Sequence, residues 1–103
     1  MTTFNEREKA YEEKFAHDEE LRFKARVKAA KLLAEWAANE IGLSPEVYVN
    51  ELVNMVTAGK DEDELLDRIA TDALNKGKSL SKAALAEKYS SCQNQARDYV
   101  INH

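Results

Sequence analysis

The fold of this chain is decided by one uninterrupted stretch, residues 3–41, which reads TFNEREKAYEEKFAHDEELRFKARVKAAKLLAEWAANEI. It contains neither glycine nor proline. Thr3 and Glu6 have the spacing of a capping box, in which the hydroxyl accepts a bond from a free amide and the carboxylate reaches back. Gly42 ends the pattern, so the sequence predicts one helix over residues 4–41, about 57 Å long.

Such a helix is longer than the domain that would hold it. A domain of this length has a diameter of roughly 34 Å, so about 22 residues of the helix can lie against a core. The spacing of apolar residues shows which part does so, because a buried helical face recurs every three or four positions. The predicted buried face begins at Phe23 and consists of Phe23, Val27, Ala30, Ala34, Ala37 and Ile41, with Leu32, Leu33 and Trp36 beside them. Trp36 is predicted to be its central core residue.

The preceding segment is polar, and its large apolar residues are only Phe4, Tyr11 and Phe15. These aromatics form a stripe too thin for a core but sufficient for the groove of a partner protein. The alternative is a solvated terminus with no function. We therefore predict a division into residues 1–19, disordered or partly helical in the free protein, and a bundle domain over residues 20–103.

Three further helices are predicted, each with its own boundary signals. Ser44 and Pro45 begin the second helix, which ends near Ala58. Asp61, with Glu64 three residues later, caps the third helix. Ser81 begins the fourth, with Leu80 and Leu85 spaced as a hydrophobic staple. The predicted core residues are Val49, Leu52, Val53 and Val56 in the second helix, Leu65, Leu66, Ile69, Ala70, Ala73 and Leu74 in the third, and Leu85, Tyr89, Cys92, Ala96 and Tyr99 in the fourth. Short connections favour antiparallel neighbours, so the predicted fold is an all-α, up-and-down four-helix bundle.

The composition excludes several classes of function. The formal net charge of −4 argues against general nucleic-acid binding, which needs a basic surface. No apolar run approaches the roughly 20 residues that cross a bilayer, and the charged N-terminus lacks the apolar core of a signal peptide. We therefore expect a cytoplasmic protein that does not insert into a membrane. The single cysteine leaves no internal disulfide.

The sequence offers no arrangement of catalytic or metal-binding residues. The only histidines are His17 and His103, and Cys92 lies in an apolar seam, where a small buried side chain is expected. No metal-ligand spacing is present. Gly77 precedes a lysine and a serine, but no strand comes before it and the first glycine of a phosphate loop is missing. We therefore expect no enzymatic activity, no metal and no tightly bound cofactor.

Positive charge is concentrated in one short block. Residues 22–31 carry five bases and no acid, whereas residues 1–20 carry seven acids and three bases. The long basic side chains can simply flank an apolar face and reach solvent. They can also form a contact for an acidic protein surface or for nucleotide phosphate groups. The residues of this possible contact are Arg22, Lys24, Arg26, Lys28 and Lys31.

Four segments resemble one protein family, namely REKA at 7–10, FAHDEELRFK at 15–24, KLL at 31–33 and WAA at 36–38. They are similar to the zeta subunit of the bacterial F-type ATP synthase, over residues 3–43 and more loosely over 59–65. The resemblance implies a four-helix bundle whose N-terminal segment inhibits ATP hydrolysis by inserting between an alpha and a beta subunit beside the central rotor. It also implies peripheral association with the membrane-bound synthase and possible weak binding of ATP or ADP.

Carried onto this chain, the resemblance places the inhibitory segment in residues 1–19. The partner-binding residues that it implies are Thr3, Phe4, Arg7, Glu8, Lys9, Tyr11, Lys14, Phe15 and His17. A different hypothesis remains open, in which the bundle is a nucleotide-sensing or adaptor domain and the N-terminus is incidental. Removal of the segment separates the two, because an inhibitor would lose its function and an adaptor would keep its ligand.

The mismatch between helix length and domain size makes a prediction about the free protein. Backbone NMR order parameters should be low before about His17 and rise along the following helix. Values near 0.85 from Phe4 onward are typical of a rigid backbone and would contradict this prediction.

Overall fold

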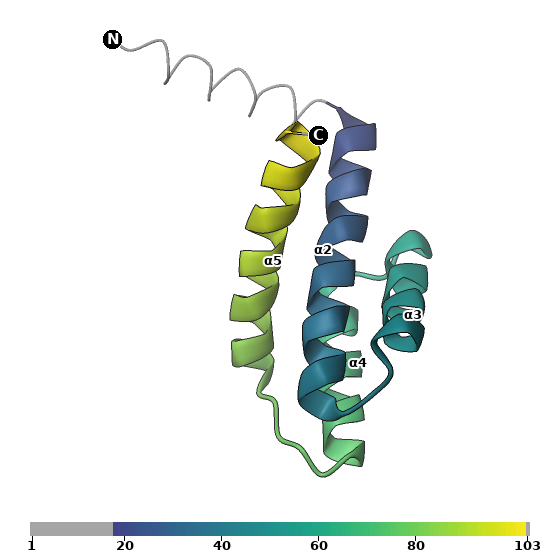
Figure 1. Cartoon of the computed structure of the whole chain (residues 1–103), viewed down its shortest axis with the longest axis vertical. Helices are drawn as coiled ribbons and strands as arrows, with labels where there is room; N and C mark the ends of the chain where they lie inside the picture. Colours follow the sequence, from purple (N-terminus) through teal and green to yellow (C-terminus); the bar gives the residue numbers. More distant parts are fainter. Residues whose placement is uncertain (1–17, 103) are drawn as a thin grey trace, which may run out of the picture.

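Four α-helices make up the computed structural model, which describes residues 18–102 (Figure 1). They are α2 (Glu19–Ile41), α3 (Pro45–Thr57), α4 (Glu62–Asn75) and α5 (Lys82–Asn102). Successive helices run in opposite directions, and no strand occurs among the described residues. The predicted all-α four-helix bundle is therefore confirmed.

Helix α2 begins at Glu19, so the prediction of one continuous helix over residues 4–41 is wrong at Asp18. The backbone of Asp18 is extended, with φ −102° and ψ 103°, and its side chain accepts a hydrogen bond of 3.1 Å from the amide of Leu21. Aspartate favours this conformation because its carboxylate satisfies an amide that has no partner inside the helix. The expected capping box at Thr3 and the aromatic stripe lie outside the described residues.

The other helix boundaries agree with the sequence signals. Asp61 Oδ1 accepts a hydrogen bond of 2.9 Å from the amide of Glu64, and Ser81 Oγ accepts one of 3.1 Å from the amide of Ala84. Ser44 occupies the predicted capping position of α3, although its side chain makes no capping bond. Gly42 ends α2 with a φ of 91°, a left-handed conformation that favours glycine over other residues.

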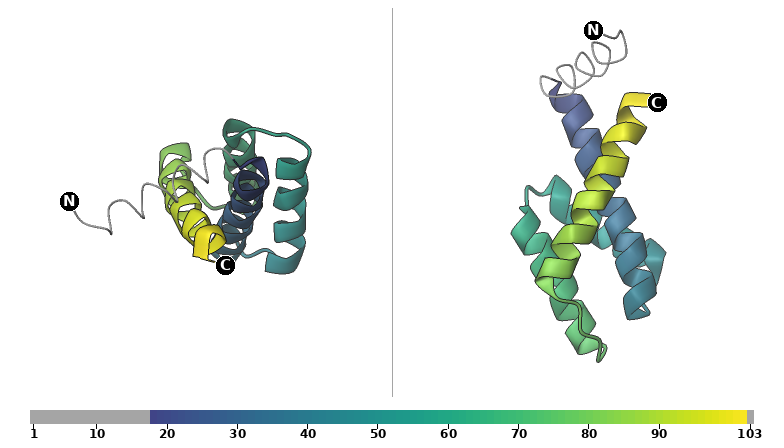
Figure 2. Two further views of the ribbon diagram at one scale, coloured as in Figure 1. Left: turned by 90° about the horizontal axis from the view of Figure 1, so that it is seen from above. Right: turned by 90° about the vertical axis from the view of Figure 1, so that its left-hand side faces the viewer.

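The helices have unequal lengths, and this determines the shape of the bundle. Helix α2 lies between α5 and α3, while α4 lies behind α2 (Figure 1). The 13 residues of α3 and 14 of α4 are too few to cover the 23 residues of α2. In consequence α3 and α4 pack against the C-terminal part of α2, and α5 accompanies α2 towards its N-terminus, crossing it at an angle (Figure 2).

Alanine dominates the buried surface of α2. Six of its eight buried residues are alanines, namely Ala25, Ala29, Ala30, Ala34, Ala37 and Ala38. Small side chains let neighbouring helices approach closely, and the partners supply the volume that fills the core. Leu52, Leu65, Ile69 and Leu85 are among the largest side chains that are fully buried in this way.

Several predicted core residues are more exposed than expected. Trp36 is only partly buried, at the edge of the core, with the ammonium group of Lys88 5.5 Å from its ring centre. Phe23 is 47% exposed, because the row to which it belongs continues beyond the reach of α3. Leu74, the penultimate residue of α4, is 67% exposed, and Tyr99, near the end of α5, is 48% exposed. Helix ends project past their neighbours, so a periodic pattern can extend beyond the packing that it serves. Val27, Leu32, Val49, Val53 and Ala70 are partly buried.

Leu33, which has no exposed surface, replaces Trp36 as the residue of α2 that should contribute most to the stability of the bundle. Leu33→Ala should reduce the free energy of unfolding by about 2–5 kcal/mol, because it leaves a cavity between tightly packed helices. Trp36→Ala should cost less than Leu33→Ala, since its ring is partly in solvent. The exposed Leu74→Ala is the control and should change stability by about 0.5 kcal/mol or less. Denaturant unfolding measures all three, and a Trp36 variant less stable than the Leu33 variant would contradict the assignment.

Candidate functional site

The five bases of the basic block do not form one surface. Each residue of a helix is rotated by about 100° from the previous one, so Ala25 separates the side chains around it into two sets. Ala25 is buried. Arg22 and Arg26 lie on one side of it, and Lys24 and Lys28 on the other, and the two pairs line different cavities together with residues of α5.

The arginines line a groove between the two long helices, which we call the arginine groove. Its volume is about 350 Å³. It is lined by Arg22, Ala25 and Arg26 from α2 and by Gln93, Asn94 and Arg97 from α5. Arg97 comes from a part of the chain that sequence reasoning did not connect with the basic block. No signal in the local sequence could have found it, because the pairing of α2 with α5 brings it there.

The arginine groove has an unbalanced charge. None of its six lining residues is acidic. Among residues 18–102, none of the three arginines takes part in an ion pair of the structure. All three are exposed. The groove therefore offers three guanidinium groups to an anion from outside the bundle.

The lysines of the basic block, unlike the arginines, include two that contact other side chains of the bundle. Lys24 Nζ lies 3.2 Å from Glu20 Oε1 one turn earlier, and Lys28 Nζ lies 4.5 Å from the ring centre of Tyr99. Lys31 is exposed. Lys24 and Lys28 therefore have partners within the bundle. Whether any of the five bases contacts a nucleotide or an acidic surface stays a prediction.

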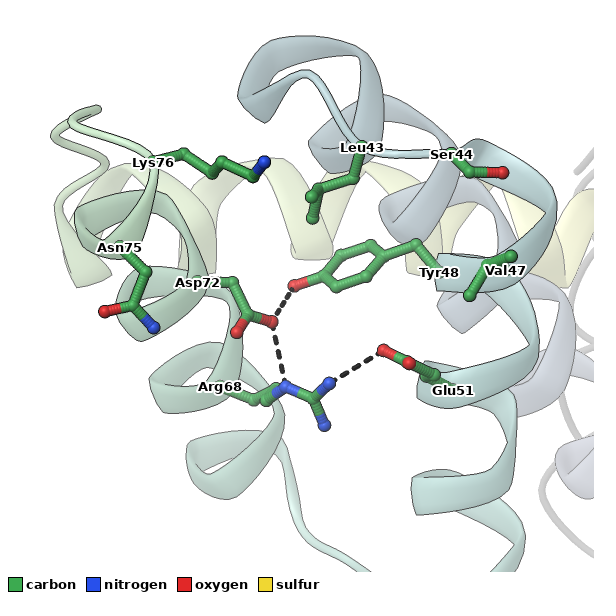
Figure 3. Close-up of a pocket in the computed structure, with 9 residues that line it drawn as sticks. All are labelled: Leu43, Ser44, Val47, Tyr48, Glu51, Arg68, Asp72, Asn75 and Lys76. Carbon is green, nitrogen blue, oxygen red and sulfur yellow. Dashed lines mark hydrogen bonds and ion pairs between the residues drawn. The ribbon is translucent and has the colours of Figure 1, made fainter.

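A second polar cluster connects α3 with α4 and lines a cavity of about 300 Å³ (Figure 3). The hydroxyl of Tyr48 donates a hydrogen bond of 2.8 Å to Asp72 Oδ2, and the same oxygen accepts one of 2.8 Å from Arg68 Nε. Arg68 Nη2 then donates to Glu51 Oε2 at 2.7 Å. Sequence reasoning missed this cluster, although Arg68 and Asp72 have the spacing of an ion pair on one helical turn.

The cluster is a structural connection and not a reactive site. Burial and the hydrogen bond to the Asp72 carboxylate raise the pKa of Tyr48 well above its ordinary value, so its hydroxyl stays protonated at neutral pH. A protonated phenol that donates to a carboxylate holds two helices together and is a poor nucleophile. Tyr48 is itself 3% exposed, which adds apolar packing to the polar connection.

No catalytic arrangement is present in the described part of the chain. Cys92 is buried as predicted, and burial raises the pKa of its thiol, which disfavours the nucleophilic thiolate. Residues 18–102 contain no group of side chains suited to hold a metal ion. The same range contains no helix long and apolar enough to cross a bilayer.

The residues expected to bind the partner, from Thr3 to His17, lie outside the described residues. Comparison with known proteins covers these residues as well as the bundle. The model of one protein family, described as ATPase inhibitor subunit zeta, matches residues 1–99. Neither a curated protein nor a solved structure shows a significant match.

The Tyr48–Asp72 connection makes the stability of the bundle sensitive to alkaline pH. The folded state holds the Tyr48 proton at a pH where the unfolded chain releases it, so this part of the stability is complete below about pH 10 and falls as pH rises further. Tyr48→Phe should cost about 1 kcal/mol at neutral pH, from the lost hydrogen bond, and should make the alkaline decline shallower. Urea unfolding of both proteins between neutral and alkaline pH measures this, and parallel declines would contradict it.

Proposed function

The chain belongs to the family of ATPase inhibitor subunit zeta, and we propose that it inhibits ATP hydrolysis by an F-type ATP synthase through its N-terminal segment. Residues 1–19 insert between an alpha and a beta subunit of the catalytic head, beside the central rotor. The chain acts at the membrane-bound synthase without entering the membrane. The observation that carries the proposal is the extent of the family match, which includes residues 1–17 as well as the bundle.

The structure of the bundle supports this division of roles. Helix α2 starts with its own cap at Asp18, and the buried core among the described residues begins at Ala25. The described bundle has no buried side-chain nitrogen or oxygen without a hydrogen-bond partner. The cap at Asp18 supports a boundary between the described bundle and the proposed inhibitory segment.

The mechanism requires selective binding and no chemistry by the inhibitor. Phe4, Tyr11 and Phe15 form the apolar side of the inserted segment, and its charged residues meet the polar walls of the subunit interface. A segment that folds as it binds pays an ordering cost, which the buried aromatic rings offset. Inhibition then needs only a higher affinity for one rotational state of the head than for the others.

Tyr11 and Phe15 should anchor the inserted segment. They lie four residues apart and would share one face of a bound helix. An aromatic anchor in a partner pocket contributes about 2 kcal/mol or more, so Tyr11→Ala/Phe15→Ala should weaken inhibition by roughly three orders of magnitude. The thermal unfolding of the free chain should be unchanged. ATPase inhibition assays and calorimetry on the same preparation measure the two effects.

The matched controls use the same chain. A deletion of residues 2–17 keeps the Asp18 cap of α2 and should abolish inhibition while the bundle stays folded. Full inhibition by the double variant would exclude the aromatic stripe as the anchor. A double variant that loses stability along with inhibition would show that the stripe belongs to the bundle. A truncated chain that inhibits normally would favour the adaptor hypothesis.

A further inference from the structure

The arginine groove lies on the part of the bundle that α3 and α4 leave uncovered. Arg22 and Arg26 lie in the N-terminal half of α2, in the first two turns after Asp18. Arg97 faces them from the C-terminal part of α5, which lies beside that half of α2 (Figures 1 and 2). The groove is therefore continuous along the chain with the segment proposed to inhibit.

The residues of the groove are suited to carboxylates. A guanidinium group is a planar fork that donates two parallel hydrogen bonds to a carboxylate, and it is less strongly hydrated than an ammonium group. Arg22 and Arg26 are one helical turn apart, and Arg97 supplies a third fork from the opposite helix. The side chains of Gln93 and Asn94 add neutral amide donors, and Ala25 forms an apolar floor.

The surroundings of the groove point to a protein as the occupant. Three guanidinium groups, presented by two different helices, match a protein segment with several acidic side chains. The arginines are exposed along an open seam, so carboxylates can reach them from a partner's surface. The chain as a whole carries a charge of −4, so this concentration of positive charge is local.

The geometry points to a second contact with the synthase: the arginine groove binds carboxylate side chains of an acidic segment on the catalytic head. This inference rests on the proposed function. Attachment at two points raises the effective concentration of the inhibitory segment at its site, because the bundle and segment are directly joined. The positive groove also speeds association by electrostatic steering, which added salt screens.

The test uses the full chain and the purified catalytic head. In Arg26→Gln/Arg97→Gln, both helices lose a charge from exposed positions, so the thermal unfolding should not change. The concentration for half-inhibition should rise about tenfold at low salt, and the difference should shrink as salt screens the contact. The variant Arg26→Lys/Arg97→Lys keeps the positive charge but lacks the planar guanidinium group that donates two parallel hydrogen bonds. Its concentration for half-inhibition should therefore lie between those of the wild type and the glutamine variant. Lys76→Gln/Lys78→Gln is the charge-matched control at the other end of the bundle and should inhibit like the wild type.

The outcomes separate this inference from the proposed function. A wild-type chain that does not inhibit would refute the proposed function. A wild-type chain that inhibits, with an Arg26→Gln/Arg97→Gln variant of equal potency at all salt concentrations, would refute only the arginine contact. Stronger inhibition by that variant would show that the groove instead holds acidic residues of the same chain.

A binding measurement tests for a small anion as the alternative occupant. The isolated chain is titrated with inorganic pyrophosphate while the backbone NMR signals of Asn94 and Arg97 are followed. Saturable shifts that disappear in Arg26→Gln/Arg97→Gln, together with unchanged inhibition, would identify a small-anion site and overturn the protein contact. Weak shifts that do not saturate, together with reduced inhibition, support the contact with the head.

Discussion

Close packing of neighbouring helices against the alanine surface of α2 is the constraint on which the rest of the structure depends. Ala29, Ala30 and Ala34 have at most 1% exposed surface, so little side-chain volume separates α2 from its neighbours. A helix with small residues on its buried surface stabilises a core only when its partners supply the large side chains. Leu52, Leu65 and Leu85 supply them. The single tryptophan is consequently at the edge, because an indole in the centre would force the helices apart.

The short length of α3 and α4 has a functional consequence. Their packing covers the C-terminal part of α2, where the Tyr48–Asp72 hydrogen bond and the Arg68–Glu51 ion pair join them. The N-terminal half of α2 keeps α5 as its main neighbour, and the arginine groove lies at their seam. The fold therefore has one end that is stabilised on several sides and another that presents charge next to the proposed inhibitory segment.

The sequence predicted features that depend on residues close together in the chain better than features that depend on contacts between helices. Local signals predicted the caps at Asp61 and Ser81, because a capping bond joins residues three apart. The start of α2 was placed too early, since the absence of glycine and proline favours a continuous helix and the Asp18 cap competes with that preference. The burial of Tyr48 was missed because its apolar ring and its polar partner come from different helices.

The sequence by itself determined the helical class, the starts of α3, α4 and α5, the burial of Ala30, Ala34 and Ala37 in α2 and the position of the basic block. All of these follow from side-chain type and a spacing of a few residues. Only the tertiary structure decided that Phe23 and Leu74 are exposed, that the basic block divides at Ala25, and that Arg97 joins Arg22 and Arg26. Periodicity shows which residues share a face of a helix. How far a neighbouring helix covers that face depends on its length and crossing, which are properties of the assembled bundle.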